Sequence, residues 1–138
     1  MIVVDSSVAF KWLKTKDEPH SEQASTLLSM HIQGETRIIT LSLLFIEIAN
    51  ALSTKTATKP NIIRRDLDIL YDLDLEVYRE TADDIVTASL LARKKKTSVY
   101  DMLYAVVAKR LGTDLITADE QFVRKTKFAH VKLLSEYR

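Results

Sequence analysis

The strongest constraint on the fold of this chain is the alternation of short apolar runs with longer segments at helical spacing. The first run, "MIVVD" at residues 1–5, is continuously apolar up to its aspartate, as in a strand buried on both faces of a parallel sheet. The residues that follow, "SSVAFKWLK", place Val8 and Trp12 one helical turn apart. The same pattern predicts strands at 37–40, 75–78, 114–119 and 131–134, and helices at 20–33, 41–52, 61–73, 81–95, 98–112 and 120–126.

Strands that alternate with helices favour a parallel sheet covered on both faces. We therefore expect an α/β fold, a three-layer sandwich whose central, mostly parallel sheet of about four to five strands is flanked by helices. The sequence contains no repeat, low-complexity tract or linker, so residues 1–138 are predicted to form a single domain.

Composition excludes several classes of site. The chain has no cysteine, which rules out disulfides, thiolate zinc sites and cysteine nucleophiles. Two glycines are too few for a glycine-rich phosphate loop, and the three histidines have no metal-binding spacing. No stretch approaches the roughly 18 apolar residues of a membrane helix, and Met1 leads directly into the first predicted strand. We expect a cytoplasmic protein without a leader peptide or membrane contact.

Four carboxylates fall where an open parallel sheet binds its ligands, beyond the carboxyl ends of the strands. Asp5 ends the first predicted strand and Asp119 follows the fourth, while Asp101 lies near the start of its helix. Glu47 stands in "LSLLFIEIANAL", where a carboxylate needs a partner to offset burial. Four such groups at one edge repel each other unless a cation joins them, and oxygen ligands suit Mg²⁺ or Mn²⁺.

Each carboxylate also has a structural alternative. Asp5 can cap the helix that follows it, Ser98 with Asp101 has the form of a capping box, and so has Thr117 with Glu120. Glu47 can belong to a solvated helix stripe. It has no basic residue within one turn, so its position is the hardest of the four to explain by structure alone.

The blocks "MIVVDSSV", "LLFIEIANAL" and "SVYDMLYAVVAKRLGTDLITAD", with the spacing between them, resemble PIN-domain ribonucleases, particularly the short VapC-type toxins of toxin–antitoxin pairs. The resemblance spans Met1 to about Leu134, and its third block is the most specific. One departure is Leu41, where a proline commonly begins the glutamate helix.

The resemblance implies an acidic quartet, in which Asp5 and Asp101 are the surest metal ligands and Glu47 and Asp119 complete the site. It also assigns supporting polar roles, which fall on Ser6, Asn50 and Thr117. The implied activity is Mg²⁺- or Mn²⁺-dependent endoribonuclease cleavage of RNA by metal-activated water. The implied partners are a cognate antitoxin and a second copy of the chain.

The densest positive run, Arg93, Lys94, Lys95 and Lys96, lies just before Asp101, and a second basic run occupies residues 124–127. Such runs suit a solvated helix end. They also suit phosphate contacts with RNA. Because the net charge of the chain is only +1, affinity for RNA must come from local basic patches of this kind.

Other functions remain compatible with this sequence. A PIN-type nuclease for RNA processing or structured DNA has the same acids, and a catalytically silent, partner-binding PIN module has the same fold. A phosphoacceptor receiver also places acids at strand ends, but it needs paired acids after its first strand, whereas Val4 and Ser6 flank Asp5.

Overall fold

The computed structural model describes residues 1–137, which form five strands, seven α-helices and one short 3₁₀ helix. In chain order these elements are β1 (Ile2–Val4), α1 (Ser6–Leu13), α2 (Ser21–Ile32), β2 (Ile38–Leu41), α3 (Ser42–Thr54), α4 (Pro60–Asp72), β3 (Glu76–Tyr78), α5 (Ala82–Lys95), α6 (Val99–Arg110), β4 (Leu115–Thr117), α7 (Glu120–Thr126), β5 (Val131–Leu133) and η1 (Leu134–Glu136).

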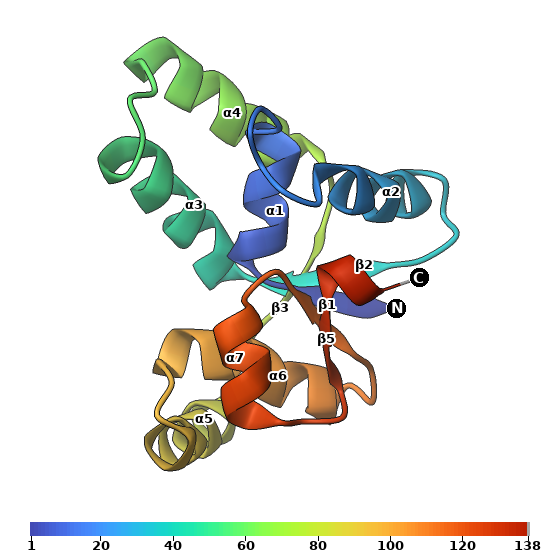
Figure 1. The fold of residues 1–138 in the computed structure, drawn as a ribbon, viewed down its shortest axis with the longest axis vertical. Helices are drawn as coiled ribbons and strands as arrows, with labels where there is room; N and C mark the ends of the chain where they lie inside the picture. Colours follow the sequence, from blue (N-terminus) through green and yellow to red (C-terminus); the bar gives the residue numbers. More distant parts are fainter. Residues whose placement is uncertain (138) are drawn as a thin grey trace.

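The sheet has the strand order β3-β2-β1-β4-β5, and every pairing is parallel. In the central strand β1, Val3 lies opposite Ile39 of β2 and Leu115 of β4. Helices α1 to α4 cover one face of the sheet and α5 to α7 cover the other (Figure 1). The predicted α/β sandwich is therefore confirmed, with all of its strands parallel. This double cover explains why every residue of β1 and β4 is buried.

The direction of winding reverses between β1 and β4. From β1 the chain steps outward to β2 and β3, then crosses to the other side of β1 for β4 and β5. Such a reversal opens a crevice at the carboxyl ends of the two central strands, where ligands bind in open α/β sheets. Asp5 directly follows β1 and Asp119 lies two residues after β4, so both acids belong to this crevice edge.

Helix α6 is the most deeply buried of the described helices. Its residues from Met102 to Ala108 are all buried, and it packs on α5, β1 and β4. Ala105 and Ala108 are almost fully buried, and their small side chains let the helix approach the sheet closely. The amino-terminal turn of α6, which carries Asp101, is thereby held beside the end of β1.

The predicted element boundaries differ little from the observed ones. Leu41 is the clearest difference, because it ends β2 opposite Tyr78 of β3 and the helix begins at Ser42 without a loop. Thr81 and Asp84 form the predicted capping box at the start of α5. No helix in the part of the chain that is described is long and apolar enough to cross a membrane.

Candidate functional site

Asp5 is buried at the end of β1, where it caps α1. Its Oδ1 accepts hydrogen bonds from the backbone nitrogens of Ser7 (3.1 Å) and Val8 (3.4 Å) and from the Ser7 hydroxyl (2.5 Å). Its Oδ2 accepts a bond of 2.5 Å from the hydroxyl of Thr117 on β4. The capping interpretation of Asp5 is thus correct, but it accounts for only one of the two carboxylate oxygens.

The burial of Asp5 changes its titration. Loss of solvation raises the pKa of Asp5 to about 6, although the hydroxyl bonds from Ser7 and Thr117 lower it. The negative charge of Asp101 raises the pKa of Asp5 further. A nearby cation would lower this pKa and so favour the charged form of Asp5.

Thr117 connects the acids at the ends of the two central strands. Its hydroxyl donates to Asp5 and accepts a hydrogen bond of 3.1 Å from the backbone nitrogen of Asp119. The predicted capping box of Thr117 with Glu120 is wrong, because the chain continues for two more residues before α7 begins. Asp119 caps that helix instead, its Oδ1 accepting from the Phe122 nitrogen at 3.0 Å.

Glu47 extends from α3 toward α6, where its partner is a phenol. The buried Tyr104 hydroxyl donates a bond of 2.6 Å to Glu47 Oε1. Burial raises the pKa of Glu47, the bond from Tyr104 lowers it, and the charge of Asp101 raises it again. The positive charge of Lys55 also lowers the pKa of Glu47, and its effect is smaller than those of burial, Tyr104 and Asp101.

Asp101 interacts electrostatically with each of the other three acids. It stands in the first turn of α6, where its backbone nitrogen donates to the Ser98 hydroxyl at 3.0 Å. Burial raises the pKa of Asp101, and the charge of Asp119 raises it as well. Because the charge of Asp101 also acts on Asp5 and Glu47, the four carboxylates form one electrostatically connected group.

A polar cavity of about 410 Å³ opens between α1 and α3 beside this group. Glu47, Ser6 and Ser7 line it from the side of the acids, and Asn50 and Lys55 line it farther along α3. Ser6 also lowers the pKa of Glu47 through a side-chain hydrogen bond. The predicted polar residues Ser6 and Asn50 therefore border the same hollow as Glu47.

The donor set has the chemistry that Mg²⁺ or Mn²⁺ prefers, because it consists of carboxylate oxygens supported by hydroxyls. Repulsion from neighbouring carboxylates contributes to the raised pKa values of Asp5, Glu47 and Asp101, and a bound cation would relieve it. Among residues 1–137, however, no three His, Asp or Glu side chains are already grouped closely enough to hold an ion. The site thus fits a divalent cation in its chemistry, without a preassembled coordination shell in its described side chains.

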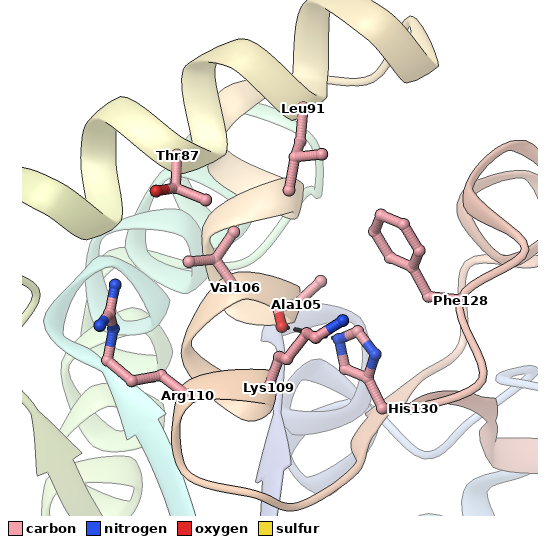
Figure 2. A pocket seen from close by; sticks show the side chains of 8 residues that line it. All are labelled: Thr87, Leu91, Ala105, Val106, Lys109, Arg110, Phe128 and His130. Atoms are coloured by element: carbon pink, nitrogen blue, oxygen red, sulfur yellow. Dashed lines mark hydrogen bonds between the residues drawn. The ribbon is translucent and has the colours of Figure 1, made fainter.

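A second cavity, of about 320 Å³, holds none of the four acids. It lies between α5, α6 and the segment before β5, and its lining is mainly apolar (Figure 2). The predicted RNA-contacting residues Arg93, Lys94 and Lys96 are exposed near the end of α5, and Lys95 is half-buried there. They do not line the polar cavity beside Glu47.

Two residues of the site were not predicted in the roles that they have. Ser7, rather than Ser6, bonds Asp5, and its hydroxyl also accepts from the Ala118 nitrogen at 2.9 Å. Tyr104 is not among the predicted site residues, yet it bonds Glu47. Its spacing of three residues from Asp101 was the available signal, since such residues share a helix face.

Comparison with known proteins agrees with the observed fold. The PIN domain family profile matches residues 2–128. The crystal structure of PAE2754 from Pyrobaculum aerophilum superposes with a TM-score of 0.70 at 20% identity, covering 97% of this chain and 89% of that one. At that identity the similarity concerns the fold. No curated protein sequence matches the chain significantly.

Proposed function

The chain belongs to the PIN domain family, a family of metal-dependent nucleases, and from this premise we propose that it is a Mg²⁺- or Mn²⁺-dependent endoribonuclease. The observation that carries the proposal is the electrostatic connection of four acids from four separate segments, with Asp101 as their common neighbour. A fold gains no stability from gathering like charges at one edge, so their placement calls for a cationic ligand.

Asp5 and Asp101 would hold the cation, with Glu47 and Asp119 completing its surroundings. When bound, a divalent ion supplies a nucleophilic hydroxide and stabilises negative charge on a phosphodiester. The chain's own residues orient the ligands: Thr117 and Ser7 fix the two oxygens of Asp5, and Tyr104 fixes Glu47. The polar cavity beside Glu47 is the place where the RNA backbone would enter, with Lys55 near its phosphates.

The test is cleavage of single-stranded RNA by purified protein with Mg²⁺ or Mn²⁺. Asp5→Asn and Asp101→Asn should each abolish cleavage and leave a cooperative thermal melt, because asparagine keeps the shape but loses the charge. Asp72→Asn is the matched control, since Asp72 is exposed on α4 away from the site. Cleavage at the wild-type rate by either site variant would remove that residue from the assignment.

We further propose that this nuclease is the toxin of a type II toxin–antitoxin pair that acts on cytoplasmic RNA. Growth arrest on induction, lost in Asp101→Asn and relieved by the product of the adjacent gene, is the expected result. Cleavage confined to structured DNA or to one RNA precursor would favour a processing nuclease. A wild type without nuclease activity on any of these substrates would favour a silent, partner-binding PIN module.

The proposal includes a homodimer. Exposed apolar side chains support self-association, notably Val86 and Leu90 on α5, which are 56% and 68% exposed. Sedimentation velocity of the wild type against Leu90→Asp tests this part independently of cleavage, and a monomeric wild type would contradict it.

A further inference from the structure

The two basic runs of the sequence lie side by side in the fold. The Lys125 ammonium at the end of α7 donates a bond of 2.9 Å to the backbone oxygen of Lys96 at the end of α5. Lys95 stands over the ring of Phe128, with its nitrogen 5.4 Å from the ring centroid. Segments almost thirty residues apart thereby form one positive surface that borders an aromatic side chain. Gathered cations repel one another, so such a surface favours a polyanion.

The mainly apolar cavity of about 320 Å³ adjoins this surface (Figure 2). Leu91 of α5 and Val106 of α6 form one side of it, and Phe128 and His130 form the other. The Phe128 and His130 rings stack with centroids 5.4 Å apart and an interplanar angle of 16°. The ring of His130 donates from Nε2 to the Ala105 carbonyl at 2.8 Å, which fixes this aromatic side against α6.

Lysines stand at the mouth of this cavity. Lys109 lines it, and Lys109 and Lys127, together with the one acid Asp114, line the hollow of about 630 Å³ that continues beside Phe128 and His130. Arg110 also lines the cavity, but its guanidinium is engaged by Asp83 and Asp84. Within residues 1–137, Lys109 and Lys127 have no ion-pair partner, so their charges are available to a ligand.

We propose that this cavity and its lysines, here called the α6 slot, bind single-stranded RNA outside the catalytic site. The slot comprises Leu91, Val106, Phe128 and His130, with Lys109 and Lys127 at its mouth. One base enters beside the aromatic pair and adjacent phosphates contact the lysines, the combination by which proteins hold single strands without sequence preference. The RNA identity of the ligand rests on the proposed function.

The position of the slot relative to the acids supports one continuous strand. Asp101 and Lys109 lie on the same helix eight residues apart, about 12 Å along its axis. Lys96 lies at the turn that joins α5 to the Asp101 end of α6. A strand cleaved at the acids can thus continue past Lys96 and Lys125 toward Phe128. An acidic peptide is the alternative occupant, but the spread of cations along a path fits a chain of phosphates better than a few carboxylates.

The experiment measures binding of labelled single-stranded oligouridine by fluorescence anisotropy in EDTA, where no cleavage occurs, over a series of salt concentrations. In the variant Lys109→Gln/Lys127→Gln, the slope of log affinity against log salt should be shallower by about 1.4, since each phosphate contact contributes about 0.7 on single strands. The matched control is Lys16→Gln/Lys59→Gln, which removes two exposed charges next to α1 and α4, helices that lie on the other side of the sheet from the slot (Figure 1). Equal changes in the two double variants would overturn the proposal.

Phe128→Leu tests the base contact separately. Leucine keeps apolar bulk in the core-facing part of the slot but lacks the aromatic face, so affinity should fall at least about fivefold with an unchanged salt slope. The thermal melt of each variant confirms folding, and the two lysine substitutions are at exposed positions. Wild-type affinity in Phe128→Leu would overturn the slot, as would a wild type that binds no oligouridine at low salt.

These outcomes separate the slot from the catalytic proposal. If the wild type cleaves RNA and the slot variants bind and cleave long RNA as the wild type does, the slot is overturned and the nuclease stands. If no RNA is cleaved but both slot variants lose binding as described, the slot stands and the nuclease falls. The proposal is also overturned if the wild type binds an acidic peptide and the slot substitutions leave RNA binding unchanged.

Discussion

The hydroxyl of Tyr104 donates a hydrogen bond of 2.6 Å to Oε1 of Glu47 and so joins α6 to α3 across the candidate site. Burial and the charge of Glu47 raise the pKa of Tyr104, which keeps its phenol protonated and able to donate. The bond in turn lowers the pKa of Glu47 against the effect of burial. Tyr104 therefore both orients this carboxylate and favours its charged form.

Tyr104→Phe removes this bond and leaves Oε1 of Glu47 without its buried donor. We expect the pKa of Glu47 to rise and the free energy of unfolding at neutral pH to fall by about 1–3 kcal/mol. Urea denaturation measures the loss. Tyr100→Phe is the matched control, because Tyr100 lies on the same helix but is 62% exposed; its change should stay within about 0.5 kcal/mol. Equal losses in both variants would show that the bond to Glu47 is not the cause.

The raised pKa of Asp5 predicts how the free energy of unfolding depends on pH. Its pKa rises from 3.8 to about 6 on folding, so the folded state keeps a proton that the unfolded chain has released. The stabilisation from this proton is complete below pH 3.8 and is lost as the pH rises through about 6. This difference between the pKa of Asp5 in the unfolded and folded states corresponds to about 3 kcal/mol.

In EDTA, the free energy of unfolding of the wild type should therefore fall, relative to that of Asp5→Asn, as the pH rises through this window. Urea denaturation at a series of pH values measures both proteins, and Asp72→Asn should follow the wild type. Parallel curves for the wild type and Asp5→Asn would contradict the raised pKa.

The sheet could be predicted because its evidence is local. A strand buried on both faces is predominantly apolar, as "IVV" and "LIT" are, and each of these strands is followed by a helical segment. The sequence places Leu41 in the helix because an apolar side chain suits a buried strand and a buried helix equally well. Its place was decided by pairing with Tyr78, a residue of another strand.

The acids could be located for a similar reason, since strand ends converge at one edge whatever the side-chain details. Their partners could not. Tyr104 is separated from Glu47 by 57 positions and Thr117 from Asp5 by 112, and these pairs depend on how α6 and β4 pack. The choice of Ser7 over Ser6 depends on the turn that starts α1, which a sequence of two adjacent serines leaves open.

Divalent cations should stabilise the protein in a pH-dependent manner. Cation binding needs ionised carboxylates, and protons compete for them below the pKa of about 6 that Asp5 has in the fold. The rise in melting temperature on adding Mg²⁺ should thus be larger near pH 7 than near pH 5. Sodium chloride at the same ionic strength controls for screening, and Asp101→Asn should lose most of the Mg²⁺ effect. Equal shifts at both pH values would count against a carboxylate site.

Glu47→Gln distinguishes a metal ligand from a structural residue. A glutamine oxygen can still accept from Tyr104, while the repulsion between Glu47 and Asp101 disappears. We therefore expect the metal-free variant to be as stable as the wild type or more stable, with weaker Mn²⁺ binding and slower cleavage. Urea denaturation without metal and calorimetric titration with Mn²⁺ measure the two effects side by side.

The alternatives for Glu47 give different results in the same pair of measurements. A solvated helix residue would change neither stability, beyond about 0.5 kcal/mol, nor Mn²⁺ affinity, which is also the result expected of the exposed control Glu22→Gln. A glutamate paired with a buried cation would cost about 3–5 kcal/mol when neutralised. The bond to Tyr104 argues against that outcome, because the partner of Glu47 is a neutral phenol. A large loss of metal-free stability, or an unchanged Mn²⁺ affinity, would exclude Glu47 from the metal site.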